Sequence, residues 1–467
     1  MIYVPEFVAL YEIFPYIEYL PLNNESIRVA VKDYLEGGEK RDAIVKMYGP
    51  IGYWNTSEVT DMSKLFCRAW KFNQSIGDWD VSKVTDMERM FYGAQTFNQP
   101  IGRWDTSSVT TMNKMFDSTY KFNQPIGKWD TSNVTNMNEM FEMNQVFNQD
   151  ISGWNTSNVI DMGSMFHSAT KFNQPIGGWD TSKVTNFREM FRFAIVFNQP
   201  IEKWNTSNVT NMLGMFCSAW NFNQPIGEWD VSKVTDMEMM FQGVKSFNQD
   251  ISKWDTSKVT TMEGMFENTE SFNQPIGRWK TSNVIYMGWM FFGATKFNQP
   301  IGDWNTSNVT TMEAMFCEAY KFNQPIGEWN TSNVINMSSM FFGSKKFNQP
   351  VCKWNTSNVI HMENMFSNTD NFNQPIEKWN VSKVTDMKCM FLCCESFNQP
   401  IGNWNVSNVT NMENMFRSAK SFNQSIGEWD TSNVTNMENM FRNAKSFNPE
   451  NAPWYCLLYT SPSPRDS

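Results

Sequence analysis

The amino-acid sequence predicts an α/β solenoid, a right-handed superhelix with one short strand and one short helix in each 25-residue unit. Tryptophan recurs every 25 residues from Trp54 to Trp454, and a Phe-Asn-Gln triplet that begins at Phe72 recurs at the same spacing. Within each unit, a stretch of alternating apolar and polar residues precedes a stretch with helical periodicity. A stacked array grows along one axis, so 467 residues need not divide into several globular cores.

The strand is predicted around each recurring tryptophan. In the unit Ile76–Pro100, apolar and polar residues alternate from Gly77 to Val81, which is typical of a half-buried strand. We expect Trp79 and Val81 to point inward, and their polar neighbours to face solvent.

The helix is predicted in the second half of the same unit. Met87, Met90, Phe91 and Ala94 have the spacing of one helix face, and Asp86 stands where an N-cap residue is preferred. A strand and a short helix in 25 residues have the size of a leucine-rich repeat.

The Phe-Asn-Gln triplet is predicted to link neighbouring units. A single unit buries too few apolar side chains to offset the entropy lost on ordering its backbone, so units must share a core and hydrogen bonds. We expect the stacked residues Asn73, Asn98 and Asn123 to form an amide ladder.

The repeat array is predicted to span residues 54–455, as sixteen units and the start of a seventeenth. Residues 23–53 are predicted to form a helical N-terminal cap, with helices over Ser26–Glu36 and Lys40–Tyr48 on either side of two glycines.

The two terminal segments are interpreted separately from the array. Residues 1–22 are rich in aromatic side chains and faintly resemble an F-box, which would make the chain an adaptor for a Skp1-type partner. Residues 456–467 resemble a translated sequencing adapter, so we expect them to be foreign to a truncated, metagenomic sequence.

Composition and motifs argue against several classes of function. The net charge is -10, whereas nucleic-acid binding requires a clustered basic surface, and no apolar run is long enough to span a bilayer. The only histidines, His167 and His361, lie eight units apart and cannot form a catalytic triad or a histidine-based metal site. We therefore expect no enzyme activity, no cofactor and no metal.

The cysteines do not form a predicted disulfide framework. Cys67, Cys217 and Cys317 share one repeat position but lie several units apart, too far to pair. The cluster of Cys389, Cys393 and Cys394 lacks the further ligands of a zinc site.

The repeat resembles that of the BspA-like leucine-rich-repeat surface proteins. The phrase WDTSNVTNM at Trp129–Met137, followed by Met-Phe and by FNQPIG, carries the resemblance, which covers Trp54 to Trp454. It implies a scaffold for adhesion or protein binding, of a kind seen in protists, algae, large DNA viruses and bacteria. The chain lacks the leucine pattern of standard repeats and a recognisable signal near Met1, which favours the cytoplasm by default and leaves the cell surface as the expectation from the resemblance.

The predicted function is a non-enzymatic scaffold that binds a protein or a glycan on the concave, strand-lined face. Charge varies there beside the invariant tryptophans, and the carboxylate row is interpreted as a solvated strand face rather than a calcium site. The alternative is a structural spacer or filament without a selective ligand. The candidate residues are Asp78, Asp80, Arg103, Asp105, Lys128, Asp130, Lys203, Asn205, Glu228, Asp230, Lys253, Asp255, Arg278 and Lys280.

Overall fold

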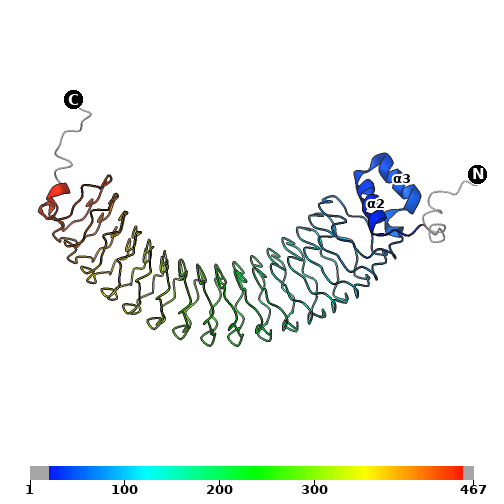
Figure 1. The fold of residues 1–467 in the computed structure, drawn as a ribbon, viewed down its shortest axis with the longest axis horizontal. Helices are drawn as coiled ribbons and strands as arrows, with labels where there is room; N and C mark the ends of the chain where they lie inside the picture. Colours follow the sequence, from blue (N-terminus) through cyan, green and yellow to red (C-terminus); the bar gives the residue numbers. More distant parts are fainter. Residues whose placement is uncertain (1–19, 456–467) are drawn as a thin grey trace, which may run out of the picture. The chain divides into compact units, whose positions relative to one another are not determined.

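The computed structural model describes residues 20–455 of the chain. The chain divides into two compact units, Met1–Lys183 and Val184–Ser467. The described part of each unit is a stack of coils in which every 25-residue repeat makes one turn (Figure 1). Each unit taken by itself is therefore a solenoid. The hand of the coil stays a prediction. The predictions for the F-box-like segment (residues 1–22) and the adapter-like segment (residues 456–467) fall largely or wholly outside the described residues.

Two helices precede the first coil, α2 (Asn24–Glu36) and α3 (Gly38–Tyr48). Both begin two residues before the predicted starts and end at the predicted residues. The Asn23 side chain accepts hydrogen bonds from the backbone N–H groups of Glu25 and Ser26, and the Ser26 hydroxyl accepts one from the Asn23 N–H. This capping box accounts for the start of α2.

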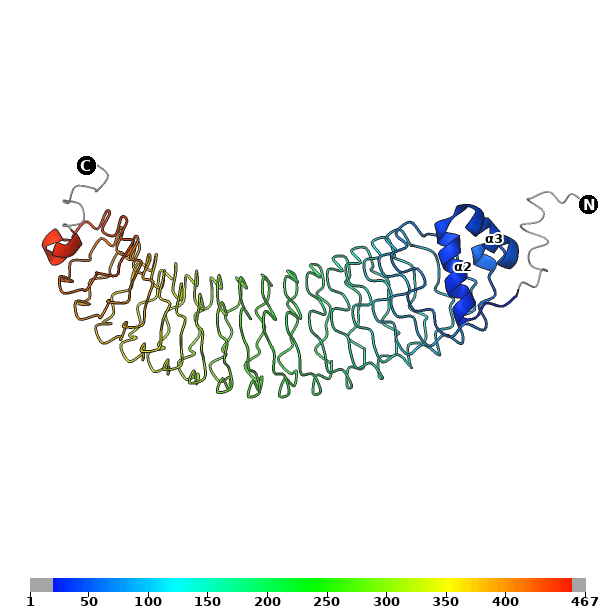
Figure 2. The same cartoon turned by 45° about the horizontal axis from the view of Figure 1, so that its top comes forward.

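Helix α2 covers the exposed edge of the first coil (Figure 2). In later coils a threonine N–H donates to the preceding coil, as Thr85 does to the Thr60 carbonyl at 2.8 Å. Thr60 has no preceding coil, and its N–H donates at 2.8 Å to the Asn24 side chain. Arg28 donates at 2.7 Å to the Ser63 carbonyl. The side chains of α2 thus replace partners that a preceding coil would supply.

The segment around each tryptophan is not a strand, which corrects the prediction for Gly77–Val81. The N–H of Trp79 donates to the Ile76 carbonyl within the same coil at 3.2 Å, so it does not enter a ladder between coils. The predicted alternation of burial is nevertheless present, since Trp79 and Val81 are buried and Asp78 is exposed.

The contacts that resemble a sheet lie elsewhere in the repeat. Single-residue parallel bridges join the position of Asp86 in successive coils, and no longer strand occurs among residues 20–455. In the first unit these bridges run through Asp61, Asp86, Thr111, Asn136 and Asp161. Two single-turn 3-10 helices, η3 (Ile51–Tyr53) and η4 (Pro449–Asn451), lie at the two ends of the array, and residues 453–455 are also helical.

The predicted helix over Met87–Ala94 is replaced by consecutive turns. Arg89 has a positive φ of 54°, in the left-handed region that interrupts a helix. Its N–H donates at 2.8 Å to the Asn113 carbonyl of the next coil, whereas the Tyr92 N–H donates back to the Arg89 carbonyl at 3.1 Å. Hydrogen bonds between coils therefore replace those that a helix would make within itself.

Aromatic side chains form continuous columns inside each stack. Within one coil, the rings of Phe91 and Phe97 stack with centroids 4.0 Å apart, and Phe91 also stacks on Phe116 of the next coil at 5.6 Å. The indole N–H of Trp104 donates to the Ile76 carbonyl of the preceding coil at 3.2 Å. These columns form the core that successive units share.

The predicted asparagine ladder is present, with a different geometry. The Asn73 side-chain oxygen accepts from the backbone N–H of Asn98 at 2.9 Å and from the Gln99 side chain at 3.0 Å. The amide thus bonds to the next coil's backbone rather than to the next asparagine side chain.

Successive coils lie closer together on one side of the stack than on the other. Ring centroids of Phe116 and Phe141 are 5.7 Å apart, whereas those of Trp104 and Trp129 are 6.3 Å apart. The second unit repeats this difference, with 5.7 Å for Phe266 and Phe291 and 6.4 Å for the tryptophan pair that begins at Trp279. Each stack therefore spreads on its tryptophan side.

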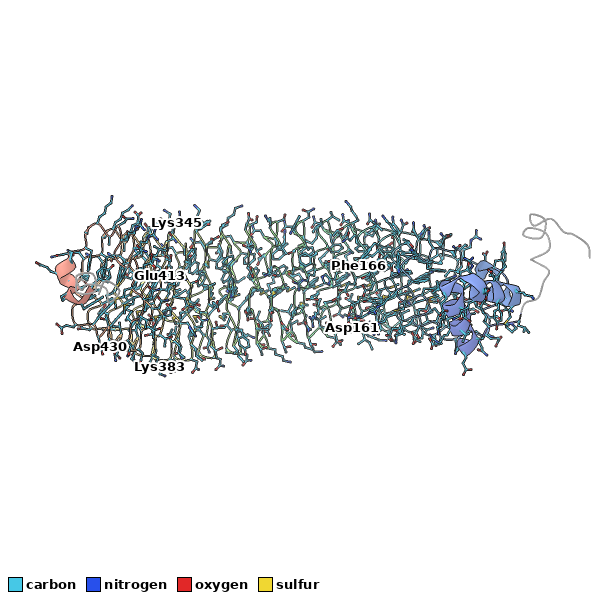
Figure 3. The ribbon with its side chains drawn as sticks, turned by 90° about the horizontal axis from the view of Figure 1, so that it is seen from above. Asp161, Phe166, Lys345, Lys383, Glu413 and Asp430 are labelled. Atoms are coloured by element: carbon cyan, nitrogen blue, oxygen red, sulfur yellow. The ribbon has the colours of Figure 1, made fainter. Side chains whose placement is uncertain are left out.

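Successive coils lie closest together on the face that carries the single-residue bridges and the turns over Met87–Ala94 and its equivalents. In the first unit Asp161 lies on this face in Figure 3. In the second unit Glu413 lies on the corresponding face, whereas Lys383 and Asp430 lie along its margin. The predicted placement of the tryptophan-flanking residues on a concave, strand-lined face is therefore wrong. The tryptophans beside these residues lie on the side where successive coils are farther apart.

Candidate ligand-binding groove

The candidate residues that follow a tryptophan stabilise turns. The Asp80 carboxylate accepts hydrogen bonds from the Ser82 backbone N–H at 3.0 Å and from the Ser82 hydroxyl at 2.7 Å. These bonds hold the pKa of Asp80 below its ordinary value. Asn205 makes the same pair of bonds to Ser207, because aspartate and asparagine both offer an acceptor oxygen.

The same kind of hydrogen bond within a turn accounts for most of the carboxylates and amides that follow a tryptophan. A side-chain oxygen bonds to the N–H two residues later at Asp80, Asp105, Asp130, Asn205, Asp230 and Asp255. Lys280 departs from this pattern, and its ammonium lies 3.2 Å from the Asp255 carboxylate. These seven candidates therefore have a structural explanation that requires no ligand.

The candidate residues that precede a tryptophan are exposed, and three of them lie together. Asp78, Arg103 and Lys128 line one hollow of about 850 Å³ in the first unit. Its remaining wall is formed by turn residues of four successive coils: Ser75, Gly77, Pro100, Gly102, Pro125, Gly127, Asp150, Ser152 and Gly153. We call this hollow the first-unit groove.

Glycine and the spread of the coils account for the shape of the groove. A Cβ atom on Gly102 would lie 2.2 Å from the Pro125 carbonyl oxygen, and one on Gly127 would lie 2.3 Å from the carbonyl oxygen of Asp150. A side chain at either glycine would therefore require the facing turn to shift, and the equivalent position of the next repeat is occupied by Ser152. Arg103 and Lys128 line the hollow beside these turns.

The groove carries two cations without an acidic partner. Among the described residues, no carboxylate oxygen lies within 4.0 Å of the charged groups of Arg103 or Lys128. Their tryptophan neighbours are stacked 6.3 Å apart, so the two cations stand one coil apart on the same side.

The same turn position is neutralised at two places in the second unit. The Lys253 ammonium lies 2.5 Å from the Glu228 carboxylate, and Lys353 lies 2.5 Å from Glu328. The hollow beside Glu328 and Lys353 measures only about 300 Å³. Arg278 lines a separate hollow of about 550 Å³, and Lys203 is exposed.

A second cluster of charges lies on the turn side of the first unit, and sequence reasoning missed it. Carboxylate oxygens of Asp117, Glu139 and Glu142 lie within 4.8 Å of one another. His167 Nδ1 lies 3.0 Å from Glu142, and the Lys114 ammonium contacts Glu139. Asp117, Glu142 and His167 share one repeat position, which is the signal that could have revealed the cluster.

Burial dominates the electrostatics of this cluster. It raises the pKa of Asp117 to about 6 and that of Glu139 to about 7. Burial also acts to raise the pKa of Glu142, but hydrogen bonds from His167 and Glu139 outweigh it and lower that pKa. Three carboxylates could together hold a cation, although Lys114 and His167 already supply positive charge when protonated.

Comparison with known families identifies the repeat. Five segments match the model of a family described as "Mycoplasma protein of unknown function, DUF285": residues 40–142, 121–221, 194–300, 286–392 and 370–457. These matches cover most of the sequence, and the chain belongs to the DUF285 family.

Solved structures offer weaker similarities. A leucine-rich-repeat protein of Leptospira interrogans, LIC12759, aligns over 98% of this chain and 97% of its own, with 8% identity and a TM-score of 0.20. The Arabidopsis receptor kinase HAESA, solved with the peptide hormone IDA and the co-receptor SERK1, aligns over 79% of this chain and 70% of its own, with 9% identity and a TM-score of 0.16. Similarity at this level carries no inference for this chain. No curated protein matches the sequence.

The structure also bears on membrane association. No helix among residues 20–455 has the length and apolar character that a bilayer-crossing segment requires.

Proposed function

We propose that the chain is a non-enzymatic, BspA-like repeat scaffold that binds a protein or glycan through the first-unit groove. The observation that carries this proposal is the placement of Arg103 and Lys128, two exposed cations without acidic partners, beside a hollow of about 850 Å³. Pockets of this size are typical of ligand sites. An exposed charge without an internal partner contributes little to stability, so a ligand offers the better account of this pair.

The absence of catalysis is part of the proposal. Asp117, Glu139 and Glu142 have perturbed pKa values, but they face Lys114 and His167 in a network of ion pairs. Such structural networks perturb pKa values without any reaction. The groove itself holds Asp78 and Asp150 with serine and glycine, and no histidine or cysteine.

Charge reversal tests the proposed function. The variant with Arg103→Glu and Lys128→Glu is expected to lose at least tenfold in the capture of a saturable partner from extracts. A matched control carries Lys203→Glu and Lys378→Glu, which change the net charge equally at the same exposed turn position in the second unit. Capture that is equal for both variants would remove the groove from the function.

A structural spacer is the second candidate, and the paired charges of the second unit favour it there. Lys253 with Glu228 and Lys353 with Glu328 link neighbouring coils instead of remaining available to a ligand. If the wild-type chain finds no saturable partner at all, the spacer becomes the preferred function for both units.

A further inference from the structure

The first-unit groove combines two cations with two carboxylates and two prolines. Arg103 and Lys128 stand in its two middle turns, while Asp78 and Asp150 lie in the turns at either end. Ionised carboxylates only accept hydrogen bonds, and proline residues contribute carbonyl oxygens but no N–H donors. The groove therefore suits a ligand that carries negative charge at its centre and neutral hydrogen-bond donors on both sides.

We infer that the first-unit groove binds an acidic oligosaccharide, with its anionic group between Arg103 and Lys128 and sugar hydroxyl groups at Asp78 and Asp150. This inference rests on the proposed function and names the class of its ligand. Arg103 can bind a carboxylate or sulfate with two parallel hydrogen bonds, and Lys128 adds a point charge one coil away. The Asp78 carboxylate can accept hydrogen bonds from hydroxyl groups. Asp150 Oδ1 already accepts from the Ser152 N–H at 2.9 Å, so its second oxygen is the one that would accept from a sugar.

An acidic peptide fits this arrangement less well. Extended peptides donate through one backbone N–H per residue, and these groups alternate in direction along the chain. A sugar ring presents several hydroxyl donors around its edge, which matches the carboxylates of Asp78 and Asp150 in the two end turns of the groove. Nucleic acid would require a longer run of cations than the two that the groove provides.

The second unit provides an internal comparison. It has the same proline and glycine turns, but Lys353 is paired with Glu328 at 2.5 Å and its hollow is about 300 Å³. The paired charges would have to be separated before an anion could bind. Binding of the acidic ligand is therefore expected in the first unit and not at this position of the second.

The test is calorimetric titration of the full chain with three matched probes. These are a hexasaccharide of alternating uronate and hexosamine, its methyl ester, and a Glu-Ser hexapeptide with the same number of carboxylates. We expect one site for the acidic hexasaccharide, at least tenfold weaker binding of the ester and the peptide, and weaker binding at high salt. Arg103→Gln with Lys128→Gln should weaken binding at least tenfold, and Lys203→Gln with Lys353→Gln should leave it unchanged.

The outcomes separate this inference from the proposed function. Equal binding of the peptide, equal binding of the ester, or no binding of the acidic hexasaccharide overturns the saccharide inference. The proposed function survives those results if Arg103→Glu with Lys128→Glu still abolishes capture of a partner from extracts. Circular dichroism of each variant establishes that the solenoid is retained.

Discussion

The indole Nε1 of Trp104 donates a hydrogen bond to the carbonyl oxygen of Ile76 in the preceding coil, at 3.2 Å. Trp129 makes the corresponding bond to Ile101 at 3.1 Å. Tryptophan is therefore invariant in the repeat for two reasons, since it fills the core and also satisfies a buried carbonyl that belongs to another unit.

Replacing Trp104 with phenylalanine separates these two roles. Trp104→Phe keeps an aromatic ring in the column but removes the hydrogen bond between coils, while the Ile76 carbonyl still accepts from the Trp79 N–H. We therefore expect a loss of about 0.5–1.5 kcal/mol in the free energy of unfolding. Urea denaturation measures this change. Trp70→Phe is the control, because the Trp70 side chain is 55% exposed, and it should change stability by less than about 0.5 kcal/mol.

The asparagine ladder offers a second test. The Asn98 side-chain oxygen accepts from the Asn123 N–H at 3.0 Å and from the Gln124 side chain at 3.0 Å. Asn98→Ala removes both bonds and should cost about 1–3 kcal/mol of unfolding free energy. Asn98→Asp keeps an acceptor at the same place and should recover at least half of that loss in thermal denaturation. Equal losses for the two variants would contradict the role of the acceptor oxygen.

The charge cluster predicts a dependence of stability on pH. Burial raises the pKa of Asp117 to about 6 from an ordinary value of 3.8, so the folded chain holds this proton more tightly than the unfolded chain. The contribution of Asp117 to stability is then fully present below about pH 4 and is lost as the pH rises through 6. Asp117→Asn should therefore stabilise the fold by about 1–3 kcal/mol at pH 7.5 and should change it little at pH 3.5.

Asp130→Asn is the matched control for that experiment. Hydrogen bonds from Ser132 lower the pKa of Asp130, so its contribution is present above its ordinary pKa and is lost as the pH falls. The difference between Asp130→Asn and wild type should accordingly have the opposite sign of pH dependence to that of Asp117→Asn. Chemical denaturation at several pH values measures both, and parallel pH profiles would contradict the assignment.

Burial was predictable from the sequence, whereas the backbone was not. Met87, Met90, Phe91 and Ala94 are all buried, as their spacing predicts, but a series of turns can bury the same positions as a helix. The deciding hydrogen bond runs from Arg89 to Asn113 in the next coil, so no property of a single unit reveals it.

The candidate site was also predictable only in part. The variable residues beside tryptophan include Arg103 and Lys128, but the same criterion selected Asp80, which accepts hydrogen bonds from Ser82. Residues that could bind a ligand can be separated from residues that stabilise a turn only when the local hydrogen bonds of each side chain are known. The hollow depends on distances between coils, and a repeat pattern does not contain those distances.

Gly102 links the stability of the solenoid to the shape of its groove. A Cβ atom at this position would meet the Pro125 carbonyl oxygen at 2.2 Å, and backbone atoms cannot move aside as the end of a flexible side chain can. Gly102→Ala should therefore force the two turns apart and cost about 1–3 kcal/mol, measured by urea denaturation. Gly178→Ala is the control, because no atom lies within 4 Å of its added Cβ, and it should be neutral or slightly stabilising.

Because Gly102 also lines the groove, Gly102→Ala should weaken binding of the acidic hexasaccharide while Gly178→Ala does not. If the two variants have equal stability, close approach of the turns is not what requires glycine at position 102.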